Sequence, residues 1–536
     1  MLRVAATIAF AALAAMVIRR RRSSLKNLRS PSHPSLLWGH EQLEFEDDQG
    51  WQWRQWFTEC GKAFKIRAAW GHPDILVMGD TVGLSHIYTK NAYNYAHSPV
   101  FRPLIERLTG RGLIWIEGER AHKRMRALVA PAFSADNVRN MHPAIYHVSH
   151  ALRDRILHEV AASGDSASLV LNVIEYTALA TLDIIGRVAF GYDFNSVGQA
   201  EETVQITEVW RKQNEMGCTH GAFVAMLALR LFPWITSLPL EAIEAQGAVA
   251  NNIRRLAKDI VANGQGDDKH EGKDLMSLLL KANAERQSGQ PVEIEDIYEH
   301  IVTFVVAGHE TTSSTLAFTI WSLARNPEVQ QKLREEVSSV VGDITYDDFA
   351  DPDRLPYLDA VCKEAMRLFP PSARNEKVAE ADDVIPLRHS VRGVDGTWID
   401  ALPVRAGQVI HIPSIAINRD QDVWGTDADT FRPTRWLVGR PSQSRYCSPD
   451  ERGIPSANEM CGGWNGLFTF SEGPRICVGL KLALFEYKAI LTTLVRTFEF
   501  HDTGVELTLR HGATLSPRVK GREDEGINLP VRLTIL

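Results

Sequence analysis

The feature that most constrains this chain is a ten-residue run around one cysteine, Phe470-Ser-Glu-Gly-Pro-Arg-Ile-Cys-Val-Gly479. Its cysteine, Cys477, follows Gly473 and Arg475 in the run and is followed by a long apolar stretch with helical character. Glycines let a backbone lie against a flat group and direct its N–H groups at a nearby sulfur. The run therefore predicts a cysteine that is held at the start of a helix and presented to a bound group.

A thiolate presented in this way has a specific chemistry. As the axial ligand of a haem iron, a thiolate donates electron density and favours cleavage of the O–O bond. Binding to the iron also deprotonates the thiol. Arg475 is placed to pair with an anionic haem propionate. The alternative is a glycine-rich turn beside a buried structural cysteine, which is the commonest environment of that residue.

A second constellation lies in the predicted long helix Ile294–Arg325, at its central run Ala307-Gly-His-Glu-Thr-Thr312. Glycine costs a helix interior about 1 kcal/mol relative to alanine, and threonine hydroxyls can bond back to preceding carbonyls and loosen a helix. This composition suits a helix whose backbone another group approaches closely; the alternative is a threonine-rich turn of a core helix. Five positions recur at helical spacing and share the predicted face: Phe304, Gly308, Thr311, Thr312 and Thr315.

A third motif pairs an acid with arginines. Glu364 and Arg367 are three residues apart in the predicted helix Leu355–Leu368 and share one helix face. A buried arginine–carboxylate pair needs further partners to offset its desolvation, and Arg435 is the candidate third member. We therefore assign these three residues to folding and to cofactor retention rather than to catalysis.

In their order and separation, the three motifs resemble the cytochrome P-450 family, and the likeness covers Leu36 to Leu536. The resemblance implies a mainly α fold with a small β component, in which haem b lies between an oxygen-activating helix and the helix after the cysteine loop. Cys477 would be the axial ligand of the haem iron. Thr311 would hydrogen-bond the dioxygen under activation, and Glu310 would relay protons inward. Glu364, Arg367 and Arg435 would form the family's structural lock.

The resemblance also implies the residues that surround haem and substrate. Around the cofactor it places Cys477, Phe470, Gly473, Arg475, Gly479, Gly308, Arg126, His122 and Lys377. Lys377 stands where many relatives have an arginine, so it keeps the charge but not the planar fork. The expected substrate pocket consists of Phe304, Val305, Ala307, Ser372, Ala373 and Thr514.

Composition narrows the function class. The chain has 536 residues and a net charge of −7, which argues against a nucleic-acid binder. Its six scattered cysteines do not suggest a disulfide framework. The resemblance implies a monooxygenase that inserts one atom of O2 into an apolar small molecule of fungal specialised metabolism. The sequence has no dinucleotide-binding fingerprint, which indicates a separate reductase, and the resemblance implies that this partner is an NADPH-dependent flavoprotein reductase.

Two other functions stay open on the sequence. A relative with the same fold could rearrange peroxides or oximes without a reductase, although those branches commonly lose the pair Glu310 and Thr311. A haem or gas sensor would need only Cys477.

The N-terminus predicts a membrane anchor. Residues 4–18 are uncharged and apolar, and four arginines follow at positions 19–22. Basic residues stay on the cytosolic side, so we expect an anchor at 1–18, a basic linker with prolines at 19–35 and a catalytic domain at 36–536. The expected location is the endoplasmic reticulum membrane, with the catalytic domain cytosolic. A cleaved signal peptide is the alternative, but no small-residue cleavage site follows the apolar run.

Periodicity outlines the remaining elements. Helices are predicted at Val138–Ala161, Val173–Phe190, Ile294–Arg325 and Leu355–Leu368. Short strands are predicted at Ile75–Met78, Ser390–Val394, Val409–His411 and Val505–Leu509. The stretches Asn263–Lys273 and Val438–Gly463 are predicted to be surface loops of the same domain.

Overall fold

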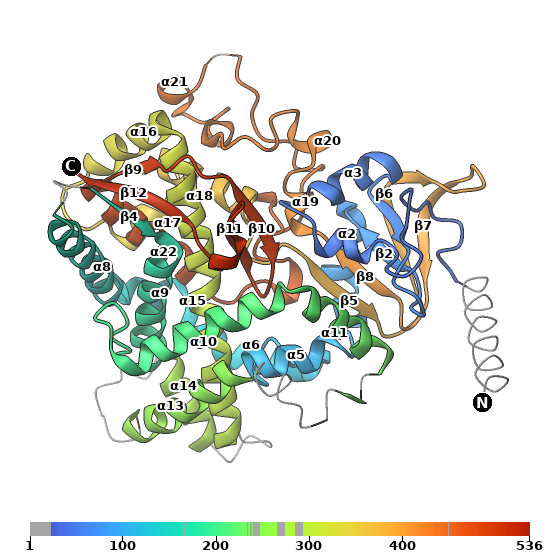
Figure 1. The fold of residues 1–536 in the computed structure, drawn as a ribbon, viewed down its shortest axis with the longest axis horizontal. Helices are drawn as coiled ribbons and strands as arrows, with labels where there is room; N and C mark the ends of the chain where they lie inside the picture. Colours follow the sequence, from blue (N-terminus) through green and yellow to red (C-terminus); the bar gives the residue numbers. More distant parts are fainter. Residues whose placement is uncertain are drawn as a thin grey trace.

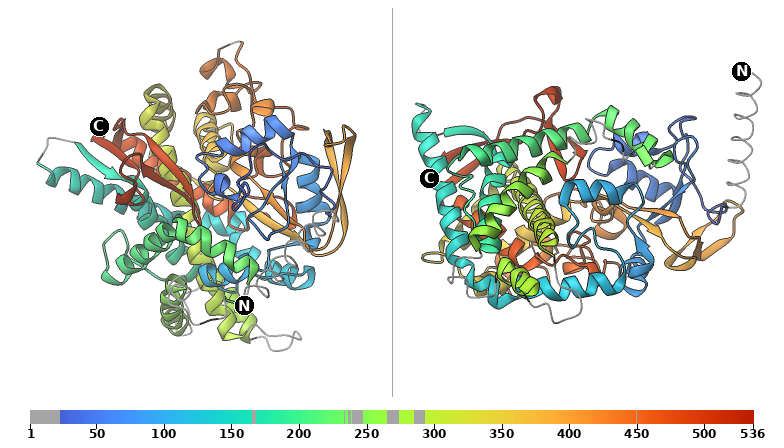
Figure 2. Two further views of the ribbon diagram at one scale, coloured as in Figure 1. Left: turned by 45° about the vertical axis from the view of Figure 1, so that its right-hand side comes forward. Right: turned by 90° about the horizontal axis from the view of Figure 1, so that it is seen from below.

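The computed structural model of this chain describes residues 23–164, 168–232, 234–235, 238, 247–264, 274–284, 293–448 and 450–536. Helices form most of it, and strands are short, so the expected mainly α fold with a small β component is confirmed. Most helices gather on one side of the molecule, whereas the largest sheet and the β6–β7 hairpin lie on the other (Figures 1 and 2).

The helix α15 (Ile294–Arg325) runs through the middle of the molecule (Figure 1). Acidic residues occupy its first turn and Arg325 its last, as the helix dipole favours. Most of its side chains are buried, including those of almost every residue from Thr312 to Ala324. Such all-round burial is expected of a helix with neighbours on every side. α15 packs along α9 (Val173–Phe190) and against α22 (Leu480–Thr497), where the Thr319 and Tyr487 hydroxyls lie 2.7 Å apart.

The other helices surround this core. They are α2 (Glu41–Phe45), α3 (Trp51–Cys60), α4 (Thr81–Ser85), α5 (Phe101–Thr109), α6 (Glu119–Val129), α7 (Ala135–Asn140), α8 (His142–Ala162), α10 (Glu201–Gly217), α11 (His220–Leu231), α13 (Ala248–Gly264), α14 (Leu275–Ala284), α16 (Pro327–Ser338), α17 (Tyr346–Ala350), α18 (Pro356–Leu368), α19 (Ser414–Ile417), α20 (Gln421–Trp424) and α21 (Gln443–Tyr446).

The strands form four small sheets. The largest has the order β1-β2-β8-β5-β3, a second has the order β4-β12-β9, and β6-β7 and β10-β11 are two-stranded. Their bounds are β1 (Ala63–Ile66), β2 (Ile75–Met78), β3 (Tyr95–Ala96), β4 (Ser168–Asn172), β5 (Asn375–Ala379), β6 (Asp383–Arg392), β7 (Trp398–Val404), β8 (Val409–Ile412), β9 (Phe498–Asp502), β10 (Leu507–His511), β11 (Leu515–Val519) and β12 (Pro530–Ile535).

The predicted helices agree closely with the observed ones, with one exception. α9 and α15 have the predicted bounds, and α18 begins one residue later than predicted. The predicted helix Val138–Ala161 is instead divided at Met141 into α7 and α8. The physical reason is Pro143 in the first turn of α8, because proline has no N–H and obstructs the preceding helical turn.

The N-terminal region contains one boundary that differs from expectation. Leu25 and Leu28 were expected in a linker, yet both are buried in a core cluster with β1 and β2. The folded part therefore begins before Leu36. The predicted anchor lies outside the described residues, as does most of the predicted loop Asn263–Lys273. Within the described ranges, no helix has the length and apolar character needed to cross a membrane.

Candidate haem site

The cysteine loop is a tight turn that leads directly into α22. It contains a 3₁₀ turn at Gly473–Arg475, and Gly479 caps α22. The Cys477 N–H donates to the Phe470 carbonyl at 3.0 Å, which closes the turn. Gly473 has a φ of +69°, and a Cβ there would lie 2.1 Å from the Tyr88 carbonyl oxygen. Glycine is therefore required at this position.

Cys477 differs from the other cysteines of the chain. Its side chain is exposed although it lies deep in the fold, where burial raises the pKa of the thiol. The Gly479 N–H and the Arg126 guanidinium oppose that rise. By contrast, Cys60 and Cys362 are buried, and burial raises the pKa of each to about 12. An interior thiol with open space beside it and donors that favour its thiolate suits an iron ligand.

The middle of α15 provides a second accessible point in the interior. Thr311 is exposed, whereas Thr312 to Ile320 are all buried. The Thr311 hydroxyl donates to the Ala307 carbonyl at 2.8 Å, as threonines inside helices often do. Thr312 and Thr315 were expected on the same face, but Thr312 contacts Glu486 and Thr315 donates to the Phe369 carbonyl at 3.3 Å. Of the three threonines, only Thr311 remains accessible.

Gly308 has a close neighbour in another helix. The resemblance implies that this glycine lies at the cofactor site, where it would let haem approach the helix. A Cβ at Gly308 would instead lie 2.8 Å from Cγ1 of Ile185 in α9. The close neighbour is a packed helix, so the glycine is explained by the contact between α15 and α9.

The predicted acid, Glu310, lies beside this accessible point. One of its carboxylate oxygens, Oε2, accepts a hydrogen bond from the Thr514 hydroxyl at 3.4 Å. The other, Oε1, lies 3.4 Å from Nε2 of the buried His309. Glu310 and Thr311 are adjacent residues of α15, and the Glu310 carboxylate contacts both Thr514 and His309.

Basic side chains gather near Cys477, as the resemblance implied. Arg126 in α6 donates to the Ile476 carbonyl at 2.7 Å. Arg475 donates to the Ile116 carbonyl at 3.0 Å and pairs with Glu117 at 2.7 Å. Burial, followed by repulsion from Arg475, lowers the pKa of Lys377 to about 8. Arg475 and Lys377 thus lie near the Glu117 carboxylate, and Arg126 lies near Cys477.

Two histidines belong to the same cluster. Nδ1 of His122 lies 3.1 Å from the Tyr93 hydroxyl, and burial, then Arg475 and Arg126, lower the His122 pKa to about 4. His97, which the sequence analysis missed, lies 2.6 Å from Glu117, and burial lowers its pKa. Burial alone would raise the pKa of Glu117, but the bonds from His97 and the charge of Arg475 lower it to about 2.

These observations test whether haem fits. Nε of Arg475 is buried and has no hydrogen-bond partner among the described residues. The cluster therefore has both an excess of positive charge and an unused donor, which two anionic propionates would satisfy. Arg126, Arg475 and Lys377, with His122 and His97, would hold the propionates, and Cys477 would hold the iron. The donor set and the interior space fit the group.

The acid–arginine motif forms a fully buried network behind the loop. Glu364 pairs with Arg367 at 2.8 Å and with Arg435 at 3.0 Å, and all three side chains are 0% exposed. Burial alone would raise the pKa of Glu364, but Arg367 and Arg435 lower it below its usual value. Arg367 also donates to the Asn418 carbonyl at 2.9 Å, and Asn418 bonds to Phe468 and Thr469. The network thereby holds the chain just before the cysteine loop.

The expected substrate residues do not all lie together. Phe304 stacks on Phe133 with ring centroids 5.4 Å apart, and Ala307 is half-buried beside Thr311. The Leu515 N–H donates to the Pro371 carbonyl at 3.1 Å, which brings the segment of Thr514 to that of Ser372 and Ala373. Val305 is completely buried.

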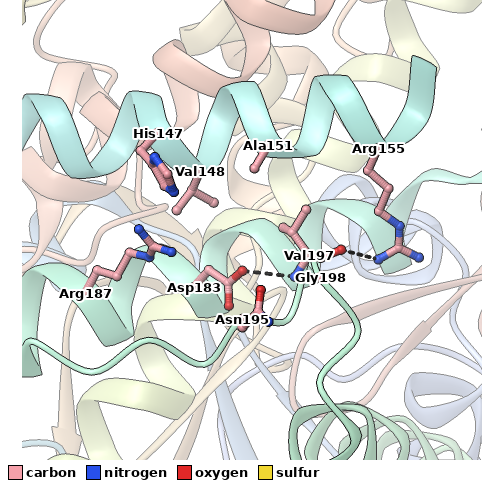
Figure 3. A pocket seen from close by; sticks show the side chains of 9 residues that line it. All are labelled: His147, Val148, Ala151, Arg155, Asp183, Arg187, Asn195, Val197 and Gly198. Atoms are coloured by element: carbon pink, nitrogen blue, oxygen red, sulfur yellow. Dashed lines mark hydrogen bonds between the residues drawn. The ribbon is translucent and has the colours of Figure 1, made fainter. Parts of the chain in front are cut away.

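A surface pocket between α8 and α9 (Figure 3) is separate from these residues. Its charged groups already have partners. Asp183 accepts from the Val197 N–H at 2.9 Å, Arg155 donates to the Val197 carbonyl at 3.0 Å, and Arg187 pairs with Asp193 at 2.6 Å. These contacts hold the loop after α9 against α8 and α9, so the charged groups of the pocket have a structural role.

Comparisons with known proteins agree with this geometry. The sequence model of the family Cytochrome P450 matches residues 30–520. The chain is 31% identical over 533 residues to cytochrome P450 monooxygenase claO of Ampulloclitocybe clavipes and 30% identical over 525 residues to claQ of the same fungus. It is 30% identical over 536 residues to cytochrome P450 monooxygenase 205 of Postia placenta.

In each of these three alignments, 96% of this chain covers 94% of the relative. The match therefore extends over the helices, the sheets and all three motifs, not over the cysteine loop alone. The relatives are all named as monooxygenases, which are oxidoreductases. The chain belongs to the cytochrome P450 family and is an oxidoreductase of the monooxygenase class.

Proposed function

We propose that the protein is a membrane-anchored haem-thiolate monooxygenase that oxidises an apolar small molecule of fungal specialised metabolism. The observation that carries the proposal is the pair of accessible groups in an otherwise buried interior, the Cys477 thiol and the Thr311 hydroxyl. They come from α15 and from the loop before α22, two helices that pack on each other. One group can hold a metal and the other can donate a hydrogen bond.

Three side chains have different roles in the proposed reaction. When bound, haem supplies the iron centre at which dioxygen is activated. Cys477 would hold that iron as a thiolate, which the Gly479 N–H and Arg126 favour. Thr311 turns its hydroxyl from the Ala307 carbonyl into the site and donates a hydrogen bond there. Glu310 replaces the proton that Thr311 passes on.

The substrate class follows from the walls of the space. Phe304 and Ala373 are buried apolar residues on two different segments. Thr514, next to Glu310, is the polar member of the expected pocket. Apolar walls with few polar groups favour an apolar small molecule that one or two hydrogen bonds orient.

The electrons are proposed to come through a separate reductase, because the sequence has no dinucleotide-binding fingerprint, and membership of the family favours an NADPH-dependent flavoprotein as that partner. Product formation should then need reductase, NADPH and O2 together. Product formation from an organic hydroperoxide alone, with no requirement for reductase, would favour the rearranging alternative.

An apolar surface patch supports the proposed membrane location. It consists of the exposed side chains of Leu37, Trp70, Leu231, Phe232 and Trp234. The Trp70 N–H donates to the Leu37 carbonyl at 2.7 Å, and a Cβ at Gly71 would lie 3.4 Å from Leu231, so the first three positions adjoin. Exposed aromatic and apolar groups of this kind suit a lipid interface.

We therefore expect the full chain to sediment with endoplasmic reticulum membranes and to resist extraction by alkaline carbonate. A variant with Ile8→Arg and Ala12→Arg in the predicted anchor should be released from the membranes by carbonate. Equal behaviour of both proteins would contradict the anchor.

The first test of the function is the reduced carbon-monoxide difference spectrum of membranes that contain the protein. We expect the strongly red-shifted Soret band of a thiolate-ligated haem, and its loss in Cys477→Ser. Cys447→Ser is the matched control, because that half-buried thiol lies outside the loop. A band typical of histidine ligation in the wild type would contradict the assignment of Cys477.

A further inference from the structure

The residue before the predicted acid is a histidine that contacts from three helices hold in place. His309 is 1% exposed. Its Nδ1 lies 2.8 Å from the Val305 carbonyl one turn earlier in α15. The Thr181 hydroxyl of α9 donates to the His309 carbonyl at 2.9 Å, and the Trp210 ring of α10 packs on the imidazole at 5.6 Å between centroids. The ring therefore has little freedom to turn.

This orientation directs Nε2 of His309 at Glu310. Nε2 lies 3.4 Å from Oε1 of Glu310, and it has no hydrogen-bond partner among the described residues. The Val305 carbonyl can only accept, so Nδ1 carries a hydrogen. A neutral imidazole with its hydrogen on Nδ1 has a lone pair at Nε2. An ionised Glu310 would direct another lone pair at it, and the two would repel each other. The contact is therefore favourable only when one further proton lies between Nε2 and Oε1.

We propose that His309 is a positioning residue that holds one proton between its Nε2 and Oε1 of Glu310. Its role in proton supply rests on the monooxygenase function proposed above. Glu310 is the charged group that faces the ring, whereas α9 and α10 contribute the uncharged Thr181 hydroxyl and Trp210 indole.

The proton balance of this arrangement is simple. The shared proton passes from Nε2 to Oε1, and Glu310 then gives up that same proton towards Thr311. The imidazole becomes neutral and keeps the hydrogen on Nδ1, and no other bond changes. Water returns one proton to the pair at the Glu310 carboxylate, whose side chain is 13% exposed. His309 thus keeps the acid supplied without contacting the reacting atoms.

The shared proton can be tested without turnover. In protein labelled with ¹⁵N-histidine, long-range ¹H–¹⁵N correlation spectra report the protonation of each ring nitrogen, and His309→Gln assigns the His309 signals. We expect a protonated Nδ1, and we expect Glu310→Gln to shift the Nε2 signal of His309. His300, equally buried in the same helix, is the internal control and should not move. An unchanged His309 signal in Glu310→Gln overturns the proposal.

The functional consequence is tested by the coupling of NADPH use to product. We expect His309→Phe to raise the share of reducing equivalents lost as hydrogen peroxide several-fold, and increasingly so as the pH rises. His309→Gln keeps a hydrogen-bond donor but no exchangeable acid, so it should also uncouple at high pH. His142→Phe is the control, because that ring packs on Tyr146 and Phe485.

Two readouts separate the possible failures. A retained carbon-monoxide spectrum shows that each variant still folds and binds haem. If Thr311→Ala uncouples but His309→Phe follows the wild-type pH profile, the positioning role of His309 is overturned. If Thr311→Ala leaves coupling unchanged, the proposed role of Thr311 in the proton pathway fails, and the ¹⁵N spectra still decide whether the proton is shared.

Discussion

At the scale of the residue, two adjacent threonines of α15 have different environments. The Thr311 side chain is exposed in the interior and donates to the Ala307 carbonyl. Thr312 is 5% exposed and contacts the Glu486 carboxyl of α22. Both are threonines in the middle of one helix, so the difference comes from the neighbouring elements. Thr311 alone is placed to donate into the proposed site.

We therefore expect Thr311→Ala to keep the thiolate spectrum but to divert electrons into hydrogen peroxide. The variant loses the hydroxyl that passes protons inward, so the peroxide formed per NADPH should rise several-fold and product formation should fall. Thr311→Ser keeps a hydroxyl and should recover most of the coupling. Coupling in Thr311→Ala equal to that of the wild type would remove this residue from the proton pathway.

The sequence was informative about the site wherever a short motif defined it. The loop around Cys477, the pair Glu310–Thr311 and the network of Glu364 lie in or between the elements that the sequence indicated. His97 and Glu117 were missed because each is an isolated residue in a loop, and only the fold brings them to Arg475. Glu486 is a single acid within the apolar run that follows the cysteine, and this position in the sequence indicates a buried carboxyl group.

At the scale of the element, periodicity predicted the long helices well but did not show what each glycine is for. The helix α15 was placed from its apolar pattern with the observed bounds. The role of Gly308 depends on Ile185 in α9, a helix far away in the sequence. A sequence pattern contains no information about which neighbour fills the space beside a glycine.

Gly308→Ala tests that contact. The new Cβ would meet Cγ1 and Cδ1 of Ile185 at 2.8 and 2.9 Å, so the Ile185 side chain or the two helices must shift. We expect the free energy of unfolding to fall by about 1–3 kcal/mol, as overpacking in a core does, measured by urea denaturation. Ile185→Ala in the same chain should recover part of the loss that Gly308→Ala causes.

The matched control for this prediction is Gly217→Ala in α10, where a Cβ meets no atom within 4 Å. That change should leave stability the same or raise it by less than about 1 kcal/mol. If Gly308→Ala behaves like Gly217→Ala, the packing explanation for Gly308 is wrong.

At the scale of the whole molecule, contacts between distant segments were beyond the sequence. β12 pairs with β4 and with β9, and β10 pairs with β11, but short strands give no indication of their partners. The partners of buried charged residues could not be predicted from the sequence either. Arg230 of α11 pairs with Glu41 of α2 and, at 3.1 Å, with Glu376 of β5. These three residues belong to separate elements, and only the folded chain brings their charges together.

Glu486 makes the stability of the whole molecule depend on pH. Its side chain in α22 is 2% exposed, and Oε2 has no hydrogen-bond partner among the described residues. Burial raises the pKa to about 8, against an ordinary value of 4.5, although the Thr312 hydroxyl partly opposes the rise. The folded protein therefore keeps a proton that the unfolded chain releases. Stability should fall by roughly 1.4 kcal/mol per pH unit between about pH 4.5 and pH 8, and then level off.

Glu486→Gln should remove this dependence, because the amide keeps the shape of the side chain and its contact with Thr312 but does not ionise. Relative to the wild type, the variant should gain stability steadily as the pH rises from about 5 to about 8, and the gain should then stay constant. Urea denaturation across that range measures it. Glu335→Gln, at an exposed position in α16, is the control and should track the wild type. A constant difference between Glu486→Gln and the wild type at every pH would mean that Glu486 is ionised in the folded protein, and its partner would then have to be sought among the groups around Thr312.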